Sequence, residues 1–174
     1  MRSKGKFARQ IPLLLLWLFL SVILWEWIFT TFVLDAPREK KFCIAVDTAV
    51  TDSKGMALEL EAILPESFRM VQVYSFDYAL MEDSSLRNAD LLILPERALE
   101  EYADWLSPVP DGLGGEDSQG ILCRNGDSAS ASRYIDYTAN EAEAGEAYYL
   151  CFGKNSLHLE EAAPMVAKYI LEME

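Results

Sequence analysis

Few side chains in this sequence are of the types that enzymes use as nucleophiles or bases. His158 is the single histidine, and with Cys151 it forms the one nucleophile–base combination worth weighing. Cys151 lies inside an apolar run, whereas a reactive thiolate needs an electropositive and partly exposed setting. The signatures HExxH, GxSxG and GxxxxGK[ST] do not occur. We therefore expect no enzymatic activity, no cofactor and no metal; a hydrolase that uses Cys151 is kept as a minor hypothesis.

Polar side chains that could bind a solute follow apolar runs that are typical of strands. In an open parallel sheet the carboxyl ends of the strands meet at one edge, where ligands bind. Hydroxyl and amide groups there would hydrogen-bond a small polar solute, and Arg97 would hold an anionic group. The candidate ligand-binding residues are Asp47, Thr48, Thr51, Asp52, Ser75, Asp77, Glu96, Arg97, Asn155 and Ser156. The competing interpretation is that Asp52, Ser53, Asp77 and Ser156 are helix caps or turn residues.

Strand and helix patterns alternate along the part of the chain that would position these residues. Compact apolar or alternating runs predict strands at residues 42–46, 69–75, 89–95 and 147–152. Helical spacing of apolar residues predicts helices at residues 54–64, 78–86, 99–106 and 160–173. The order indicates an α/β domain of βαβ units with right-handed crossovers and a mainly parallel sheet, covered on both faces.

Four stretches of this domain carry a likeness to a known family. They are residues 42–46, residues 89–96 with the helix after them, the turn Trp-Leu-Ser-Pro-Val at 105–109, and residues 148–158 before the last helix. Together they resemble one lobe of the extracytoplasmic solute-binding proteins that feed ABC importers, the type II periplasmic-binding fold. The resemblance covers most of residues 42–172. A second lobe would begin near residues 107–134, a stretch too short to build one, so the resemblance implies a one-lobe relative.

The N-terminal part of the chain reads as a transmembrane signal anchor. Residues 11–34 are mostly apolar and carry no charge apart from Glu26, and a helix over them would rise roughly 36 Å, enough to cross a hydrocarbon core of about 30 Å. A cleavable signal peptide is the alternative, but it would need a shorter apolar core and an A-x-A site. The basic residues Arg2, Lys4, Lys6 and Arg9 predict that the N-terminus is cytoplasmic. The expected order is a basic tail (1–10), the anchor (11–34), a stalk (35–41) and an extracytoplasmic domain (42–174).

Glu26 stands between two tryptophans near the outer end of this apolar stretch. One interpretation is that the tryptophan rings mark the membrane interface and the carboxylate reaches water. The other is that Glu26 contacts a polar group on the transmembrane helix of a partner.

Charge narrows the choice of partners further. The formal net charge is -13, and because the first ten residues contribute +4, the rest of the chain carries -17. Such an acidic body repels phosphate backbones, so we expect no nucleic-acid partner.

Cys43, Cys123 and Cys151 each lie in or beside an apolar run, which favours buried thiols, although one disulfide among them is also compatible with the sequence.

These features together predict a protein of the cell membrane that spans the bilayer once. We expect its extracytoplasmic domain to be a solute-binding-like, non-enzymatic accessory or sensor of a membrane transporter. The alternative is a structural subunit of a membrane complex that assembles through its transmembrane helix.

Overall fold

The computed structural model describes residues 4–29, 36–76, 86–113, 119–139 and 145–173, and the chain divides into two compact units, Met1–Pro37 and Arg38–Glu174. The first unit is built on one helix, α1 (Lys4–Ile28). Its segment Ile11–Ile28 has a mean hydropathy of 2.1 and is not buried against other parts of the chain. The Ser21 hydroxyl donates to the carbonyl oxygen of Trp17 at 2.8 Å, which satisfies this polar group within the helix.

Helix α1 is therefore long and apolar enough to cross a membrane, a property that membrane anchors share with signal sequences. The predicted span extends to residue 34, and its last part, residues 30–35, lies outside the described residues.

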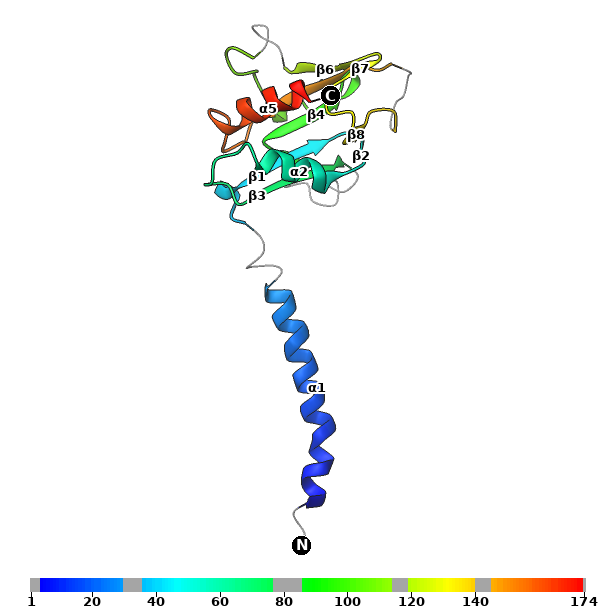
Figure 1. Ribbon diagram of the computed structural model, residues 1–174, viewed down its shortest axis with the longest axis vertical. Coiled ribbons are helices and arrows are strands. Elements are labelled where there is room, and N and C mark those ends of the chain that lie inside the picture. Colours follow the sequence, from blue (N-terminus) through cyan, green and yellow to red (C-terminus); the bar gives the residue numbers. More distant parts are fainter. Residues whose placement is uncertain (1–3, 30–35, 77–85, 114–118, 140–144, 174) are drawn as a thin grey trace. The chain divides into compact units, whose positions relative to one another are not determined.

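The second unit is an α/β domain, as the sequence predicts, and its centre is a single curled sheet (Figure 1). The strands of the main sheet are, in spatial order, β3 (Met70–Ser75), β1 (Lys41–Val46), β4 (Leu91–Pro95), β9 (Tyr148–Gly153), β6 (Ile121–Asn125) and β7 (Ser128–Ala129), with β5 (Leu106–Ser107) beside β9. A separate two-stranded ribbon pairs β2 (Ala49–Val50) with β8 (Ile135–Asp136).

Strand directions differ from the prediction of a mainly parallel sheet. β1 runs parallel to β3 and to β4, but β9 is antiparallel to β4, β5 and β6. The sheet is therefore mixed. The physical reason lies in the connection before β9. β8 is held at the carboxyl edge of β1 through its pairing with β2, and a parallel return needs a crossover of a dozen or more residues. Residues 137–147 are too few, so the chain turns back and β9 runs the other way.

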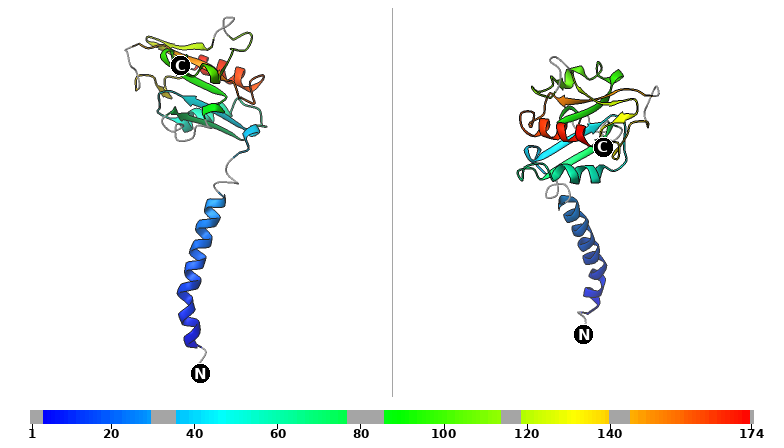
Figure 2. Two further views of the ribbon diagram at one scale, coloured as in Figure 1. Left: turned by 180° about the vertical axis from the view of Figure 1, so that it is seen from behind. Right: turned by 45° about the horizontal axis from the view of Figure 1, so that its top comes forward.

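Both faces of the sheet are covered, which explains why β4 is apolar at five consecutive positions. Leu91 and Ile93 point to one face, where α2 (Ser53–Glu61) and α5 (Ala162–Glu172) complete a large hydrophobic core. Leu92 and Leu94 point to the other face and pack in a smaller cluster with Leu106. Two views of the domain show α2 and α5 on the same side of the strands (Figure 2).

One connection between the strands differs from the prediction, and another lies mostly outside the described residues. Residues 99–106, predicted as a helix, contain instead a turn, the short 3₁₀ helix η4 (Ala103–Trp105) and the first residue of β5, and another 3₁₀ turn, η3 (Glu96–Ala98), precedes them. The predicted helix at 78–86 falls almost wholly outside the described residues. The helix between β1 and β3, α2, covers one face of the sheet, and Phe76 and Leu86, the described residues on either side of the gap before β4, pack on the other face. This places a topological switch point between β1 and β4.

Candidate functional site

The carboxyl ends of the parallel strands bring half of the predicted site residues to one edge of the sheet. Asp47 and Thr48 follow β1, Ser75 ends β3 beside Val46, and Glu96 and Arg97 follow β4. Thr51 and Asp52 belong to the segment that leads from β2 into α2. Asp77 lies outside the described residues.

Several of these side chains at the carboxyl edge hold the fold together. The Thr48 hydroxyl is buried and donates to the carbonyl oxygen of Asp136 at 2.6 Å, which ties β1 to β8. Asp52 caps α2, because its Oδ1 accepts the backbone N–H of Gly55 at 2.8 Å. Arg97 pairs with Glu146 at 2.5 Å. For Asp52 the helix-cap interpretation is therefore the one that the geometry supports.

Asn155 and Ser156 lie at the opposite edge of the sheet from Asp47 and Thr48. They follow β9, and because β9 is antiparallel to β4 they emerge beside the first residues of β4. The structure thus separates the predicted residues into two groups that cannot contact one solute. Glu26, the predicted membrane contact, is in α1 and belongs to the other unit.

A buried carboxyl group organises this second edge. Asp90 Oδ1 accepts the Ser156 hydroxyl at 2.6 Å, and Oδ2 accepts the backbone N–H of Cys43 at 2.8 Å. Burial raises the pKa of Asp90, although these two hydrogen bonds and the charges of His158 and Arg38 oppose the shift. Asp90 therefore fixes the loop after β9 to the start of β1.

The same loop is held from two further directions. The Arg38 guanidinium, just after the first unit, donates to the carbonyl oxygen of Asn155 at 2.5 Å. The Asn155 side-chain amide donates to the carbonyl oxygen of Arg87 at 3.0 Å. A loop held at this many points gives a preformed wall for anything that binds against it.

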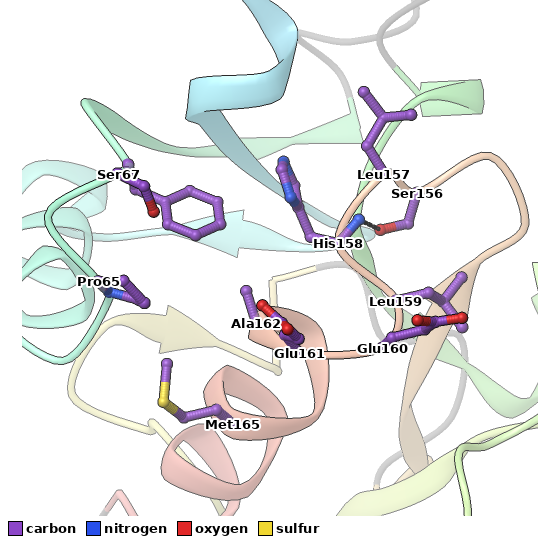
Figure 3. A pocket seen from close by; sticks show the side chains of 11 residues that line it. Pro65, Ser67, Ser156, Leu157, His158, Leu159, Glu160, Glu161, Ala162 and Met165 are labelled. Carbon is purple, nitrogen blue, oxygen red and sulfur yellow. Dashed lines mark hydrogen bonds between the residues drawn. The ribbon is translucent and has the colours of Figure 1, made fainter.

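A pocket of about 550 Å³ opens on the other side of this loop. Its walls are residues 65–68, which follow α2, the loop 156–161, and the first turn of α5 (Figure 3). Phe68, Ala162 and Met165 give it an apolar surface, and Glu160 and Glu161 add two carboxylates. The volume lies within the range of small-molecule sites, about 300 to 1,000 Å³.

His158 forms part of this pocket, and one of its ring nitrogens has no partner among the residues that the structure describes. The ring packs edge-to-face on Phe68, with centroids 4.7 Å apart, and lies 6.1 Å from the Phe42 ring. Its backbone N–H donates to the Ser156 hydroxyl at 3.0 Å, the contact drawn in Figure 3. Nε2 is buried, and among the described residues it has no hydrogen-bond partner. An unsatisfied buried nitrogen costs on the order of 1 to 3 kcal/mol.

Cys151 and His158, the nucleophile–base pair considered from the sequence, lie on opposite faces of the sheet. Cys151 is fully buried in the smaller cluster on one face of the sheet, whereas the His158 ring packs on Phe42 of the large core on the other face. Burial raises the pKa of the Cys151 thiol to about 12, so it is not a thiolate at neutral pH. All three cysteines are free thiols. Within the described residues, no group of three or more His, Cys, Asp and Glu side chains is arranged to hold a metal ion.

Sequence reasoning missed the pocket because its walls come from segments far apart in the chain. From the sequence, Glu160 and Glu161 are predicted only as the first residues of the helix 160–173, and no role is predicted for Phe68 and Met165. One local signal was available: Asp90 is a carboxylate directly before the fully apolar strand β4, where a buried ionisable group must be paired or perturbed.

The chain shows no significant match to a protein-family model, to a curated protein or to a solved structure.

Proposed function

We propose that this protein is a membrane-anchored binding domain that acts outside the cytoplasm, without catalysis, as an accessory or sensor of a membrane transporter. The observation that carries the proposal is the pocket beside His158. It has the volume of a small-molecule site and a wall held by hydrogen bonds to the buried Asp90 carboxyl group, and it lies on an acidic unit that follows a helix able to cross a membrane.

The proposed arrangement in the membrane follows from charge and length. Residues 11–34 span the lipid bilayer, residues 1–10 stay in the cytoplasm, residues 35–41 form a stalk, and residues 42–174 lie outside. Support comes from the four basic residues that precede the apolar helix and from the acidity of the rest of the chain.

The likeness to one lobe of a solute-binding protein remains part of the proposal. It is supported by the parallel strands β3, β1 and β4, by the packing of α2 on one face of the sheet, and by the packing of Phe76 and Leu86 on the other face. The antiparallel β9 places the pocket at the edge opposite the switch point, so the proposed binding site differs from the one that the resemblance implies.

A ligand screen on the full chain in detergent tests the binding function. A solute that binds the folded protein at 100 times its Kd raises the free energy of unfolding by about 2.7 kcal/mol, so its melting temperature rises measurably. We expect at least one class of small polar solute to do so. If amino acids, amines, carboxylates, sugars and phosphates all leave the melting temperature unchanged at 10 mM, roughly 100 times a Kd of 0.1 mM, the binding function is wrong.

A second candidate function is a structural subunit that assembles through α1. Glu26 favours it, because a carboxylate within an apolar membrane helix is costly and often contacts a partner helix. Under this hypothesis Glu26→Leu abolishes the co-purification of a membrane partner, whereas Glu26→Gln, which keeps the hydrogen-bonding capacity, retains part of it. Equal recovery of the partner with the wild type, Glu26→Leu and Glu26→Gln would exclude a role for Glu26 in assembly.

A further inference from the structure

The charges around the pocket beside His158 point to the chemistry of its ligand. Two carboxylates, Glu160 and Glu161, lie in its wall, and no lysine or arginine is among the described residues that line it. The positive end of the α5 dipole also faces the pocket, but it amounts to roughly half a charge and so does not offset two carboxylates. Even with a charge on His158 counted, the two carboxylates exceed these positive charges, so the wall is negative on balance, in a chain that is itself strongly acidic.

Glu161 is placed unusually for a residue at its position. It is the N-cap of α5, where Ser, Thr, Asp or Asn normally accepts a backbone N–H of the helix, yet its side chain makes no capping hydrogen bond. Figure 3 shows its carboxylate turned toward the centre of the pocket beside Ala162, whereas the Glu160 carboxylate points away past Leu159. Glu161 is thus the charged group best placed to meet a ligand.

The remaining surface of the pocket suits an apolar body with a positive head. Phe68 is half-buried and presents ring surface, and Met165 is 38% exposed although it is apolar. An ammonium group is attracted to an aromatic face as well as to a carboxylate, and thioether and aromatic groups accept aliphatic stems of varied shape.

We infer that this pocket binds an organic cation, an ammonium group carried on a short aliphatic stem, with Glu161 holding the charge and Phe68 and Met165 covering the stem. The inference rests on the proposed binding function and names its ligand class. The acidity of the domain raises the local concentration of such cations, so binding weakens as salt is added.

The single histidine makes a direct test possible in the full chain. In a detergent-solubilised, ¹³C-labelled sample, the Cε1–H signal of His158 needs no assignment by mutagenesis, because no other histidine is present. The probes are n-pentylammonium, 1-pentanol and pentanoate, which share a five-carbon stem and differ in the charge of the head. We expect a saturable shift of the His158 signal with pentylammonium, a weaker response to pentanol, and none with pentanoate.

Two matched variants locate the charge. Glu161→Gln should weaken pentylammonium binding roughly threefold to fivefold, in the range of a partly exposed ion pair, and should leave pentanol unaffected. Glu160→Gln, the same change on the neighbouring residue, should have a smaller effect. Phe68→Leu should reduce the preference for pentylammonium over pentanol, because it removes the aromatic face and keeps an apolar side chain.

The outcomes separate this inference from the wider proposal. Binding of pentanoate as tight as that of pentylammonium would overturn the inference and leave a binding function for the pocket in place. An affinity for pentylammonium that is the same in the wild type and in Glu161→Gln would also overturn the inference and leave a binding function in place. A His158 signal that none of the three probes moves would also overturn it, and the broader solute screen would then decide whether the protein binds small molecules at all.

Discussion

Asp90 shows how one buried carboxyl group can position the loop that forms a wall of the pocket. Its two oxygens join the loop after β9 to the backbone of β1, and the same loop forms a wall of the pocket. Burial costs more than these hydrogen bonds return, so the pKa of Asp90 is raised. The residue positions the pocket loop at the expense of stability near neutral pH.

That balance predicts a pH-dependent effect of Asp90→Asn. A pKa that is higher in the folded state than the ordinary value of about 3.9 means that stability falls as pH rises from that value through the folded pKa. The asparagine can accept from Cys43 and donate to Ser156, but it cannot ionise. The variant should therefore gain stability relative to the wild type as pH increases over this window, measured by urea unfolding at a series of pH values.

Asp136→Asn provides the control of opposite sign. Hydrogen bonds from the side chain and backbone of Thr138 lower the pKa of Asp136, so its charged form contributes stability that is lost as pH falls through the folded pKa. The wild type should therefore gain stability relative to Asp136→Asn as pH rises through the folded pKa of Asp136. A difference between wild type and Asp90→Asn that does not change with pH would contradict the account of Asp90.

At the scale of elements, the contact between β9 and β4 decides where the pocket forms. The backbone N–H of Gly153, at the end of β9, donates to the carbonyl oxygen of Asp90 at 3.0 Å. The end of β9 and the residues just before β4 come so close that a Cβ on Gly153 would lie 1.9 Å from the carbonyl oxygen of Ala89. Only glycine allows this approach, and the loop that begins at the next residue leads to the pocket.

Gly153→Ala should therefore destabilise the domain by about 3 kcal/mol, the upper range for overpacking, because the clashing atom belongs to backbone and cannot rotate away. A suitable control is Gly126→Asn, in the turn between β6 and β7. Gly126 has a φ of +59° and no atom within 4 Å of an added Cβ, and asparagine tolerates that conformation. Chemical denaturation of both variants compares them. Similar losses in the two would mean that the approach of β9 to β4 is not the constraint.

At the scale of the whole molecule, the chain joins an apolar helix to an acidic folded domain. The first ten residues carry +4, and no acidic residue lies among them. If this charge sets the orientation by the positive-inside rule, the acidic domain stands on the far side of the membrane. A pocket there would face solutes before they enter the cell.

Added protease tests this orientation. In whole cells from which any outer barrier has been removed, the domain should be degraded while a cytoplasmic marker survives. The matched variant replaces Arg2, Lys4, Lys6 and Arg9 by glutamine, which should reduce the fraction of domain that the protease reaches. Protection of the wild-type domain until the membrane is lysed would show that the proposed localisation is wrong.

Local patterns in the sequence determined the features that depend on neighbouring residues alone. A long apolar stretch with Glu26 as its one charged residue predicts α1. Apolar runs predict β1, β4 and β9, because burial of both faces requires apolar side chains at successive positions. Asp52 before α2 is likewise readable as a cap, since the hydrogen bond that it makes reaches only three residues along the chain.

Only the tertiary structure decided the direction of β9, and with it the place of the pocket beside His158. That direction depends on the edge of the sheet from which the chain enters the strand. The pairing of β2 with β8, two strands more than eighty residues apart in the sequence, sets this starting point. The antiparallel return carried Ser156 away from Thr48 and brought it to Asp90, and it placed His158 and Glu161 opposite Phe68. Contacts between segments this far apart leave no periodic trace in the sequence, because each segment satisfies its own local pattern in either direction.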